Sequence, residues 1–214
     1  MEKVVLLGAG GHCKVVIDIL RDNYIIAGIT DVDREKHGTL FYGFPVLGDD
    51  SQLGRLYHEG VENALATLGS TRDSSLRRKL YELAAQNGFR MINAISKYSI
   101  ISLSARFGNG NVVMDSAIIH ADVSVGSNCI INTGAIIEHD CVIGNHVHIS
   151  PGTKIAGGVR IGNGVHIGIG ASIIQNISIG DNCVIGAGSV VIRNIPEGSV
   201  VAGVPAVDIR KDSI

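Results

Sequence analysis

A hydrophobic residue recurs every six positions over residues 99–194, which divide into sixteen blocks of six with no insertion. The first residue of a block is usually small, and the third is always Ile, Val or Phe. The third residues are Ile101, Phe107, Val113, Ile119, Val125, Ile131, Ile137, Ile143, Ile149, Ile155, Ile161, Ile167, Ile173, Ile179, Ile185 and Val191. A period of six held over this length predicts a parallel β-helix built from hexapeptide repeats.

The same pattern predicts how the chain coils. Positions one and three of a block point to one side of a strand, and position two points to the other. Positions four to six are rich in Gly, Asn, Asp and Ser, which favour turns. Three blocks make one triangular coil of 18 residues, so sixteen blocks give a little over five coils. Residues 18 apart in the sequence should therefore stack on one another.

The chain before the repeats shows alternating strand-like and helix-like segments. Strands are expected at residues 3–7, 24–30, 63–68 and 89–92, and helices at residues 13–22 and 74–87. This alternation predicts a small parallel α/β sheet of the Rossmann-like kind. The predicted organisation is an α/β domain at residues 1–94, the β-helix at residues 95–194 and a C-terminal tail at residues 195–214.

Composition and charge narrow the class of protein. The 214 residues carry a formal net charge of −2 and only 4% aromatic residues, which argues against nucleic acid or an anionic membrane as a partner. No apolar run reaches the ~18 residues of a membrane span. The N-terminus lacks the layout of a signal peptide, so we expect a cytoplasmic protein without membrane insertion.

A glycine-rich turn at residues 8–12 follows the first predicted strand and precedes the first predicted helix. This arrangement is typical of a phosphate-binding site. Asp31 ends the second strand, where an acidic residue can hold a ribose hydroxyl. Cys13 replaces the third glycine of the dinucleotide pattern, and the second half of a dinucleotide domain is missing, which favours a nucleotide diphosphate attached to another group. A structural turn without a ligand is the alternative, and His12 alone is typical of a helix-terminal residue.

One predicted turn of the β-helix carries Glu138-His139-Asp140, three titratable groups in a row. A histidine oriented by a carboxylate is the arrangement of a general base near neutral pH. Counting by 18 puts His139 between Ala121 and Gly157, whose small size would leave space for a ligand. The same count stacks Glu138 on His120, which gives Glu138 a structural role. A solvated turn histidine is the alternative for His139.

Metal binding is not expected. Cys129, Cys141 and Cys183 each occupy position one of a block, so they should be buried core residues and not ligands or disulfide partners. His148 and His166 are 18 apart and should stack on the outer surface. The pattern supplies no third ligand, so an interface or ligand-contact role is favoured for this pair.

These residues together resemble a known family. Residues 8–12, residues 137–140 and the closing Gly-Val-Pro-Ala at residues 203–206 are similar to bacterial sugar O- and N-acetyltransferases of the NeuD family, in particular to the PglD-type enzymes of nucleotide-linked 4-amino sugars. The resemblance covers essentially the whole chain. It implies a left-handed β-helix, a homotrimer with active sites between subunits, acetyl-CoA as co-substrate and a UDP-sugar held by the N-terminal domain. Val207 departs from the family pattern, where a basic residue often follows this motif.

The resemblance also implies roles for individual residues. His139 would be the general base that takes a proton from the sugar amine, and Asp140 would orient it. His148 and Gly157 match acetyl-CoA-binding positions, and no metal takes part. The residues that match the nucleotide-sugar site are Gly8, Gly10, Gly11, His12, Asp31 and Gly69.

The implied activity is an acetyl-CoA-dependent N-acetyltransferase of a UDP-linked amino sugar, in bacterial surface glycan or glycoprotein sugar biosynthesis. A second hypothesis is an O-acetyltransferase of sialic acid or another small hydroxylated acceptor. A third is a non-catalytic trimeric scaffold that binds a nucleotide sugar, against which the Glu-His-Asp turn argues.

Overall fold

The computed structural model describes residues 1–69 and 73–210, which form two compact units. One unit comprises residues 1–69 and 75–94 and has α/β structure, and the other contains the repeats from Ile95 onward. Residues 211–214 of the expected tail lie outside the described residues.

The α/β unit contains a six-stranded sheet with strand order β3-β4-β2-β1-β5-β6. All neighbouring pairs are parallel except β3 and β4, which confirms the predicted parallel α/β sheet. The strands are β1 (Glu2–Leu7), β2 (Tyr24–Thr30), β3 (Leu40–Phe41), β4 (Phe44–Gly48), β5 (Asn63–Ala66) and β6 (Arg90–Met91). Because β1, β2 and β5 are parallel, their carboxyl ends meet at one edge of the sheet.

Three α-helices and two short 3-10 helices connect these strands. They are α1 (Gly11–Leu20), η1 (Arg34–Lys36), η2 (Asp50–Gln52), α2 (Leu53–His58) and α3 (Ser75–Gln86). Leu56 of α2 and Leu80 of α3 pack with Val5 and Leu7 of β1 in one buried cluster. Within residues 1–69 and 73–210, no helix has the length and apolar character needed to cross a bilayer.

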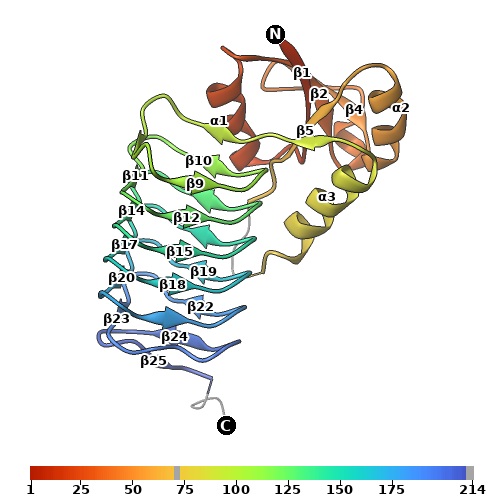
Figure 1. The fold of residues 1–214 in the computed structure, drawn as a ribbon. Coiled ribbons are helices and arrows are strands. Elements are labelled where there is room, and N and C mark those ends of the chain that lie inside the picture. Colours follow the sequence, from red (N-terminus) through yellow and green to blue (C-terminus); the bar gives the residue numbers. More distant parts are fainter. Residues whose placement is uncertain (70–72, 211–214) are drawn as a thin grey trace. The chain divides into compact units, whose positions relative to one another are not determined.

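The repeats form a left-handed parallel β-helix, in which a two-residue strand occupies positions two and three of every block (Figure 1). The sixteen strands are β8 (Ile100–Ile101), β9 (Arg106–Phe107), β10 (Val112–Val113), β11 (Ile118–Ile119), β12 (Ser124–Val125), β13 (Ile130–Ile131), β14 (Ile136–Ile137), β15 (Val142–Ile143), β16 (His148–Ile149), β17 (Lys154–Ile155), β18 (Arg160–Ile161), β19 (His166–Ile167), β20 (Ser172–Ile173), β21 (Ser178–Ile179), β22 (Val184–Ile185) and β23 (Val190–Val191). A further strand, β7 (Ala94–Ile95), precedes them.

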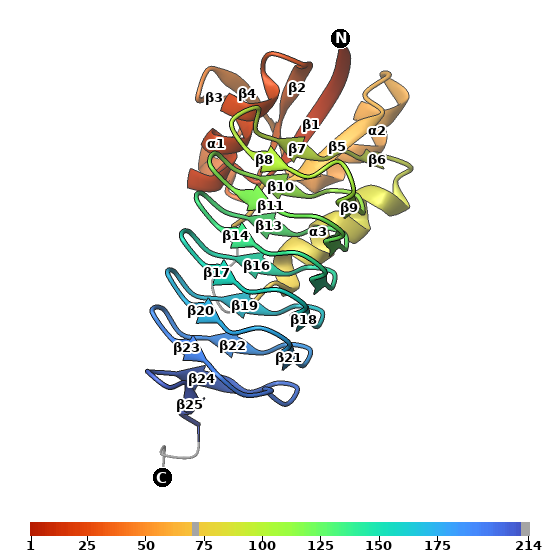
Figure 2. The same ribbon diagram turned by 60° about the vertical axis from the view of Figure 1, so that its left-hand side comes forward.

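Strands 18 residues apart pair in parallel, as predicted, and form three sheets that run along the β-helix (Figure 2). Ile118 pairs with Ile136, and Ile136 pairs with Lys154. The residues at position three are almost all buried in one continuous core, so each coil buries its apolar surface against its neighbours. Cys129, Cys141 and Cys183 are buried in this core as free thiols, which confirms their expected place.

A ladder of side-chain hydrogen bonds supports one corner of the β-helix. Along this corner each turn donates its backbone N–H to a side-chain oxygen one coil further on. The donor and acceptor pairs are Asn109 N to Ser127 Oγ (3.1 Å), Ser127 N to Asn145 Oδ1 (2.8 Å), Asn145 N to Asn163 Oδ1 (2.8 Å) and Asn163 N to Asp181 Oδ1 (2.8 Å). The ladder satisfies turn donors that the strands leave unpaired.

The last coil is shorter than the others. Ile179 bridges Ile195, and Val184 pairs with Val200, so the separation there falls to 16 residues. The side chain of Asn194 accepts a hydrogen bond from Ser178 N at 2.8 Å, in place of the regular backbone ladder. The β-helix therefore continues through β24 (Val200–Ala202), into the expected tail. β25 (Val207–Asp208) then pairs antiparallel with β24.

Ile143 and Val142 are adjacent on β15 but face opposite sides, because Ile143 is buried in the core and Val142 is exposed. Ile143→Ala should lower the free energy of unfolding by about 2–5 kcal/mol, since it leaves a cavity. Val142→Ala should change it by less than about 1 kcal/mol. Urea denaturation of both variants would measure the difference, and equal losses would contradict the assignment of inward and outward positions.

Candidate active site

The carboxyl ends of β1, β2 and β5 hold the glycine-rich loop. Gly8 N donates to Thr30 O at 2.8 Å, and Thr67 Oγ1 donates to Gly8 O at 2.7 Å. Gly8 has φ of +108°, which favours glycine. These bonds anchor the loop to both neighbouring strands, so its position is set by the sheet.

The Asp31 carboxylate is engaged with this loop. Its Oδ2 accepts from Ala9 N at 2.7 Å, its Oδ1 accepts from Asp33 N at 2.9 Å, and Lys36 Nζ lies 3.3 Å from Oδ2. Burial alone would raise the pKa of Asp31, but the two backbone hydrogen bonds and Lys36 outweigh it, so the pKa lies below its ordinary value. Asp31 therefore stays ionised and fixes the loop.

The space above the loop is open. A Cβ at Gly10 or Gly11 would meet nothing within 4 Å, and Gly10 precedes α1 as its N-cap residue without a side-chain hydrogen bond to the first turn. The backbone N–H groups of the first turn are then suited to an anion. A Cβ at Gly69, which follows β5, would lie 3.6 Å from His12 Cβ. The structure thus brings the residues of the predicted nucleotide-sugar site to one edge of the sheet.

His139 lies in the turn between β14 and β15. We use "the His139 corner" for this turn and the turns stacked on it, residues 102–104, 120–122, 138–140, 156–158, 174–176 and 192–194. Asp140 N donates to Ala121 O at 3.0 Å, and Gly158 N donates to His139 O at 2.9 Å, so the turn is held from below and above. Asp140 adopts a left-handed φ of +61°.

Asp140 orients the His139 ring. His139 Nδ1 lies 2.7 Å from Asp140 Oδ2, so Nδ1 is the donor to the carboxylate and Nε2 is left as the acceptor. The hydrogen bond with Asp140 raises the pKa of His139 above its ordinary value, and the charges of Asp140 and Glu138 add to this effect. The ring is 64% exposed, so Nε2 is accessible to a substrate.

Gly157 lies directly against this ring, as the 18-residue count predicted. A Cβ at Gly157 would come within 2.8 Å of both Cε1 and Nε2 of His139, so a side chain here would displace the ring from this position. No acceptor for the Gly157 backbone N–H is found among residues 1–69 and 73–210. The predicted stacking of His120 and Glu138 is also confirmed, with His120 Nε2 3.7 Å from Glu138 Oε1.

His148 does not meet His139 within one chain. It lies on β16, in the sheet that does not contribute to the His139 corner. Its ring packs edge-on against His166 at 5.1 Å between centroids, which confirms the predicted stacking. The expected exposure on the outer surface is wrong for His148, which is buried. Both rings line a groove of about 430 Å³ together with Asn132 and Ile169. No group of three or more His, Cys, Asp or Glu side chains suited to a metal ion occurs in the described part of the chain.

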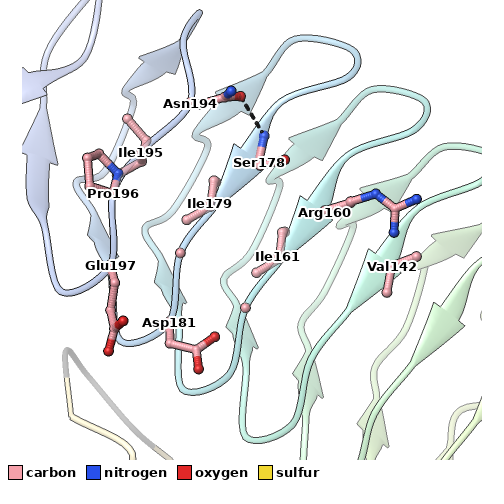
Figure 3. A pocket seen from close by; sticks show the side chains of 12 residues that line it. Val142, Arg160, Ile161, Ser178, Ile179, Asp181, Asn194, Ile195, Pro196 and Glu197 are labelled. Carbon is pink, nitrogen blue, oxygen red and sulfur yellow. Dashed lines mark hydrogen bonds between the residues drawn. The ribbon is translucent and has the colours of Figure 1, made fainter.

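A second groove, which the sequence reasoning missed, lies beside the His139 corner on the face of β15, β18 and β21 (Figure 3). Its volume is about 480 Å³, and its polar side chains include Arg160, Asn194 and Glu197. It forms where the coil shortens by two residues. The loss of the six-residue register near Pro196 was the only sequence signal for it.

Comparisons with protein families match both units. The family described as the PglD N-terminal domain matches residues 3–84, and the bacterial transferase hexapeptide (six repeats) family matches residues 124–157 and 158–193. An uncharacterised protein of Acanthamoeba polyphaga mimivirus is 37% identical over 111 residues. That match covers 51% of this chain and 21% of the viral protein's length.

Several solved structures are similar to nearly the whole chain, and two of the three described here contain CoA or acetyl-CoA. A variant of GDP-perosamine N-acetyltransferase from Caulobacter crescentus, in complex with CoA and GDP-perosamine, is 38% identical with a TM-score of 0.90 and 97% of each chain covered. The acetyltransferase domain of PglB from Neisseria gonorrhoeae, in complex with acetyl coenzyme A, is 35% identical with a TM-score of 0.87, covering 97% of this chain and 99% of that one. WeeI from Acinetobacter baumannii is 25% identical with a TM-score of 0.84, covering 98% of this chain and 100% of that one.

The contact between Asp140 and His139 can be tested by titration. Asp140→Asn should lower the pKa of His139 toward its ordinary value, because a neutral amide does not stabilise the imidazolium. NMR titration of the ring carbons would measure it. Asp122→Asn is the matched control, since Asp122 occupies the same turn position one coil earlier and should leave the pKa of His139 unchanged. An unchanged pKa in Asp140→Asn would contradict the orienting role.

Proposed function

Because the chain belongs to the NeuD/PglD-type family of sugar acetyltransferases, and is thus an acetyl-CoA-dependent enzyme, we propose that it acetylates the amino group of a nucleotide-linked 4-amino sugar. The observation that carries the proposal is the exposed His139 ring, oriented by Asp140 and resting on Gly157. A glycine next to a general base leaves space for an acceptor amine and an acetyl group to meet, and the base can take the proton that the amine loses.

In the proposed reaction, His139 Nε2 accepts a proton as the sugar nitrogen attacks the thioester carbonyl carbon. The C–N bond forms, the C–S bond then breaks, and CoA leaves as a thiolate that takes the proton from His139. Asp140 holds the proton on Nδ1 and stabilises the imidazolium that forms. Because both substrates are bound and aligned, the enzyme supplies mainly position and a base.

We assign the Gly157 backbone N–H to the developing oxyanion. It has no acceptor in residues 1–69 and 73–210, and it lies on the coil directly above the base. A backbone donor aimed at the carbonyl oxygen stabilises the tetrahedral intermediate at low reorganisation cost. The absence of a side chain at this position leaves room for the acetyl group.

We propose that the active site is completed in a homotrimer. In one chain, the groove containing His148 lies on a different face from the His139 corner. Acetyl-CoA bound at the His139 corner of one copy would therefore contact the His148 groove of a neighbouring copy. The outward residues of β8, β11 and β14 are Ile100, Ile118 and Ile136, and the Ile100 side chain is 64% exposed. An apolar outward row on a sheet face favours contact with another copy.

We propose that the nucleotide diphosphate binds at the open glycine loop. Gly10, Gly11 and the start of α1 would meet the phosphates, while Gly8, His12 and Gly69 shape the loop and Asp31 fixes it. The proposed carrier is UDP, in sugar biosynthesis for a bacterial surface glycan or glycoprotein. The Caulobacter crescentus relative is in complex with GDP-perosamine, so the identity of the nucleobase, uracil or guanine, must be tested directly.

Loss of the proposed general base, His139, should abolish most turnover. His139→Ala should lower kcat by a factor of about 10² or more without changing the fold, because proton transfer in the transition state is lost. Thiol release from acetyl-CoA with UDP-4-amino sugars would measure it. His58→Ala is the control, since His58 ends α2, far along the chain from the repeats. Near wild-type turnover in His139→Ala would refute the role of this residue.

A measurement of nucleotide binding distinguishes the proposed nucleotide-linked acceptor from a free sugar acceptor. We expect calorimetry to show binding of UDP and its loss in Asp31→Ala, because the loop would lose the acceptor for Ala9 N. Asp18→Ala on the exposed side of α1 should bind UDP normally. Tighter binding of GDP than of UDP would identify GDP as the carrier. Absence of any nucleotide binding would favour O-acetylation of a free sugar.

A further inference from the structure

The thiol of Cys141 has no role in the proposed reaction, although it follows His139 and Asp140 directly in the chain. Its side chain is fully buried in the core of the β-helix. Cys141 Sγ donates a hydrogen bond to Ala156 O at 3.2 Å, and within residues 1–69 and 73–210 it is the one donor to that carbonyl. Burial raises the pKa of the Cys141 thiol, so the thiol stays protonated and can donate.

This hydrogen bond bears on the direction of the Gly157 N–H. The peptide bond between Ala156 and Gly157 is trans, so its C=O and N–H point to opposite sides. Because Cys141 holds the carbonyl toward the core, the N–H points out of the His139 corner. The other backbone hydrogen bonds of this turn are Ala156 N to Ile173 O (3.0 Å), Gly158 N to His139 O (2.9 Å) and Asn176 N to Gly157 O (3.0 Å). The N–H that faces outward is the one assigned above to the oxyanion.

Cys141 differs from the other residues of its column in the core. The residues that directly follow the other turns of the His139 corner at position one of a block are all apolar, namely Ala105, Val123, Val159 and Ile177. Val123 and Val159 stand one coil before and one coil after Cys141, so packing alone does not require a thiol between them. The side-chain donor of this column therefore stands at the coil from which it reaches the Gly157 turn.

Donors at position one of other blocks make the same kind of hydrogen bond. Cys129 Sγ donates to Gly144 O at 3.1 Å, and Thr153 Oγ1 donates to Gly168 O at 3.3 Å. The geometry therefore belongs to the repeat, in which S–H···O bonds are individually weak but recur. Gly144 and Gly168 lie in turns outside the His139 corner, so these two bonds are references for the one made by Cys141.

We propose that Cys141 is a positioning residue for the oxyanion donor: its thiol holds the Ala156–Gly157 peptide so that the Gly157 N–H faces the acetyl carbonyl oxygen. A donor that is oriented before the reaction stabilises the tetrahedral intermediate without reorganisation. The hydrogen bond to the carbonyl also polarises the peptide group, which strengthens its N–H as a donor. The proposal rests on the proposed acetyltransferase function and adds a role for a core side chain that does not touch the substrates.

Cys141→Val and Cys141→Thr test this role, because the two new side chains have the same shape and differ in one hydroxyl group. Position one accepts both, as Val159 and Thr153 show. Cys141→Val should lower kcat about tenfold, a part of the roughly 10²–10³-fold loss on removal of a whole oxyanion donor. Cys141→Thr should recover most of this loss. KM for both substrates and the pH midpoint of kcat should stay at their wild-type values, since neither binding nor His139 is changed.

Cys129→Val and Cys129→Thr are the matched controls, because they remove and restore the equivalent bond to Gly144 O. They should leave kcat unchanged, and thermal melting of all four variants would measure the loss of stability separately. Equal kcat in Cys141→Val and Cys141→Thr would overturn the proposal, as would an equal loss of kcat in Cys129→Val. Each of these results requires an active wild type, so the proposed function would stand.

A measurement without turnover tests the contact itself. The nitrogen chemical shift of an amide depends on hydrogen bonding to the carbonyl of the same peptide group. In protein labelled with ¹⁵N-glycine, the Gly157 resonance should therefore move in Cys141→Val, return toward wild type in Cys141→Thr and stay in place in Cys129→Val. If no amino sugar supports turnover, the proposed function fails but this measurement remains. An unmoved Gly157 resonance in Cys141→Val would overturn the positioning role.

Discussion

The hydrogen bonds between residues 18 positions apart are the constraint on which the rest of this structure depends. Each strand of two residues is too short to be stable alone, and it is held only by the strands of the coils on either side. A slip of one residue would turn the buried isoleucines outward, so the register is fixed by the core. Columns of equivalent residues follow directly, and one of them is the His139 corner.

The proposed catalytic geometry is a consequence of this register. Gly157 lies against the His139 ring because the two residues occupy the same position in successive coils, and their turns are joined by a backbone hydrogen bond. Asp140 can reach the ring because it occupies a left-handed turn position, where Asp and Asn are tolerated among non-glycine residues. The site therefore rests on a rigid repeat and needs no long loop to position it.

Sequence alone was most informative where the period encodes position. The hexads predicted the strands, the buried cysteines and the pairs His120–Glu138 and His148–His166, because stacking is a matter of counting. It failed between residues 32 and 62, where β3, β4 and α2 are short and lack a clear period. It also missed the last coil, because there the Asn194 side chain replaces a backbone acceptor. Asp31 was located but its partners were not, since they depend on how the loop folds back.

The C-terminal end of the β-helix bears on the exposed strand edges of its last coil. A parallel β-helix that stopped after a complete coil would present unpaired backbone groups, a template for growth into fibres. Here the final coil is two residues short, and β25 runs antiparallel along β24. The 18-residue spacing of the strands is thus broken at this edge. The antiparallel β25 therefore lies along β24 at the edge where a further coil would supply a parallel strand.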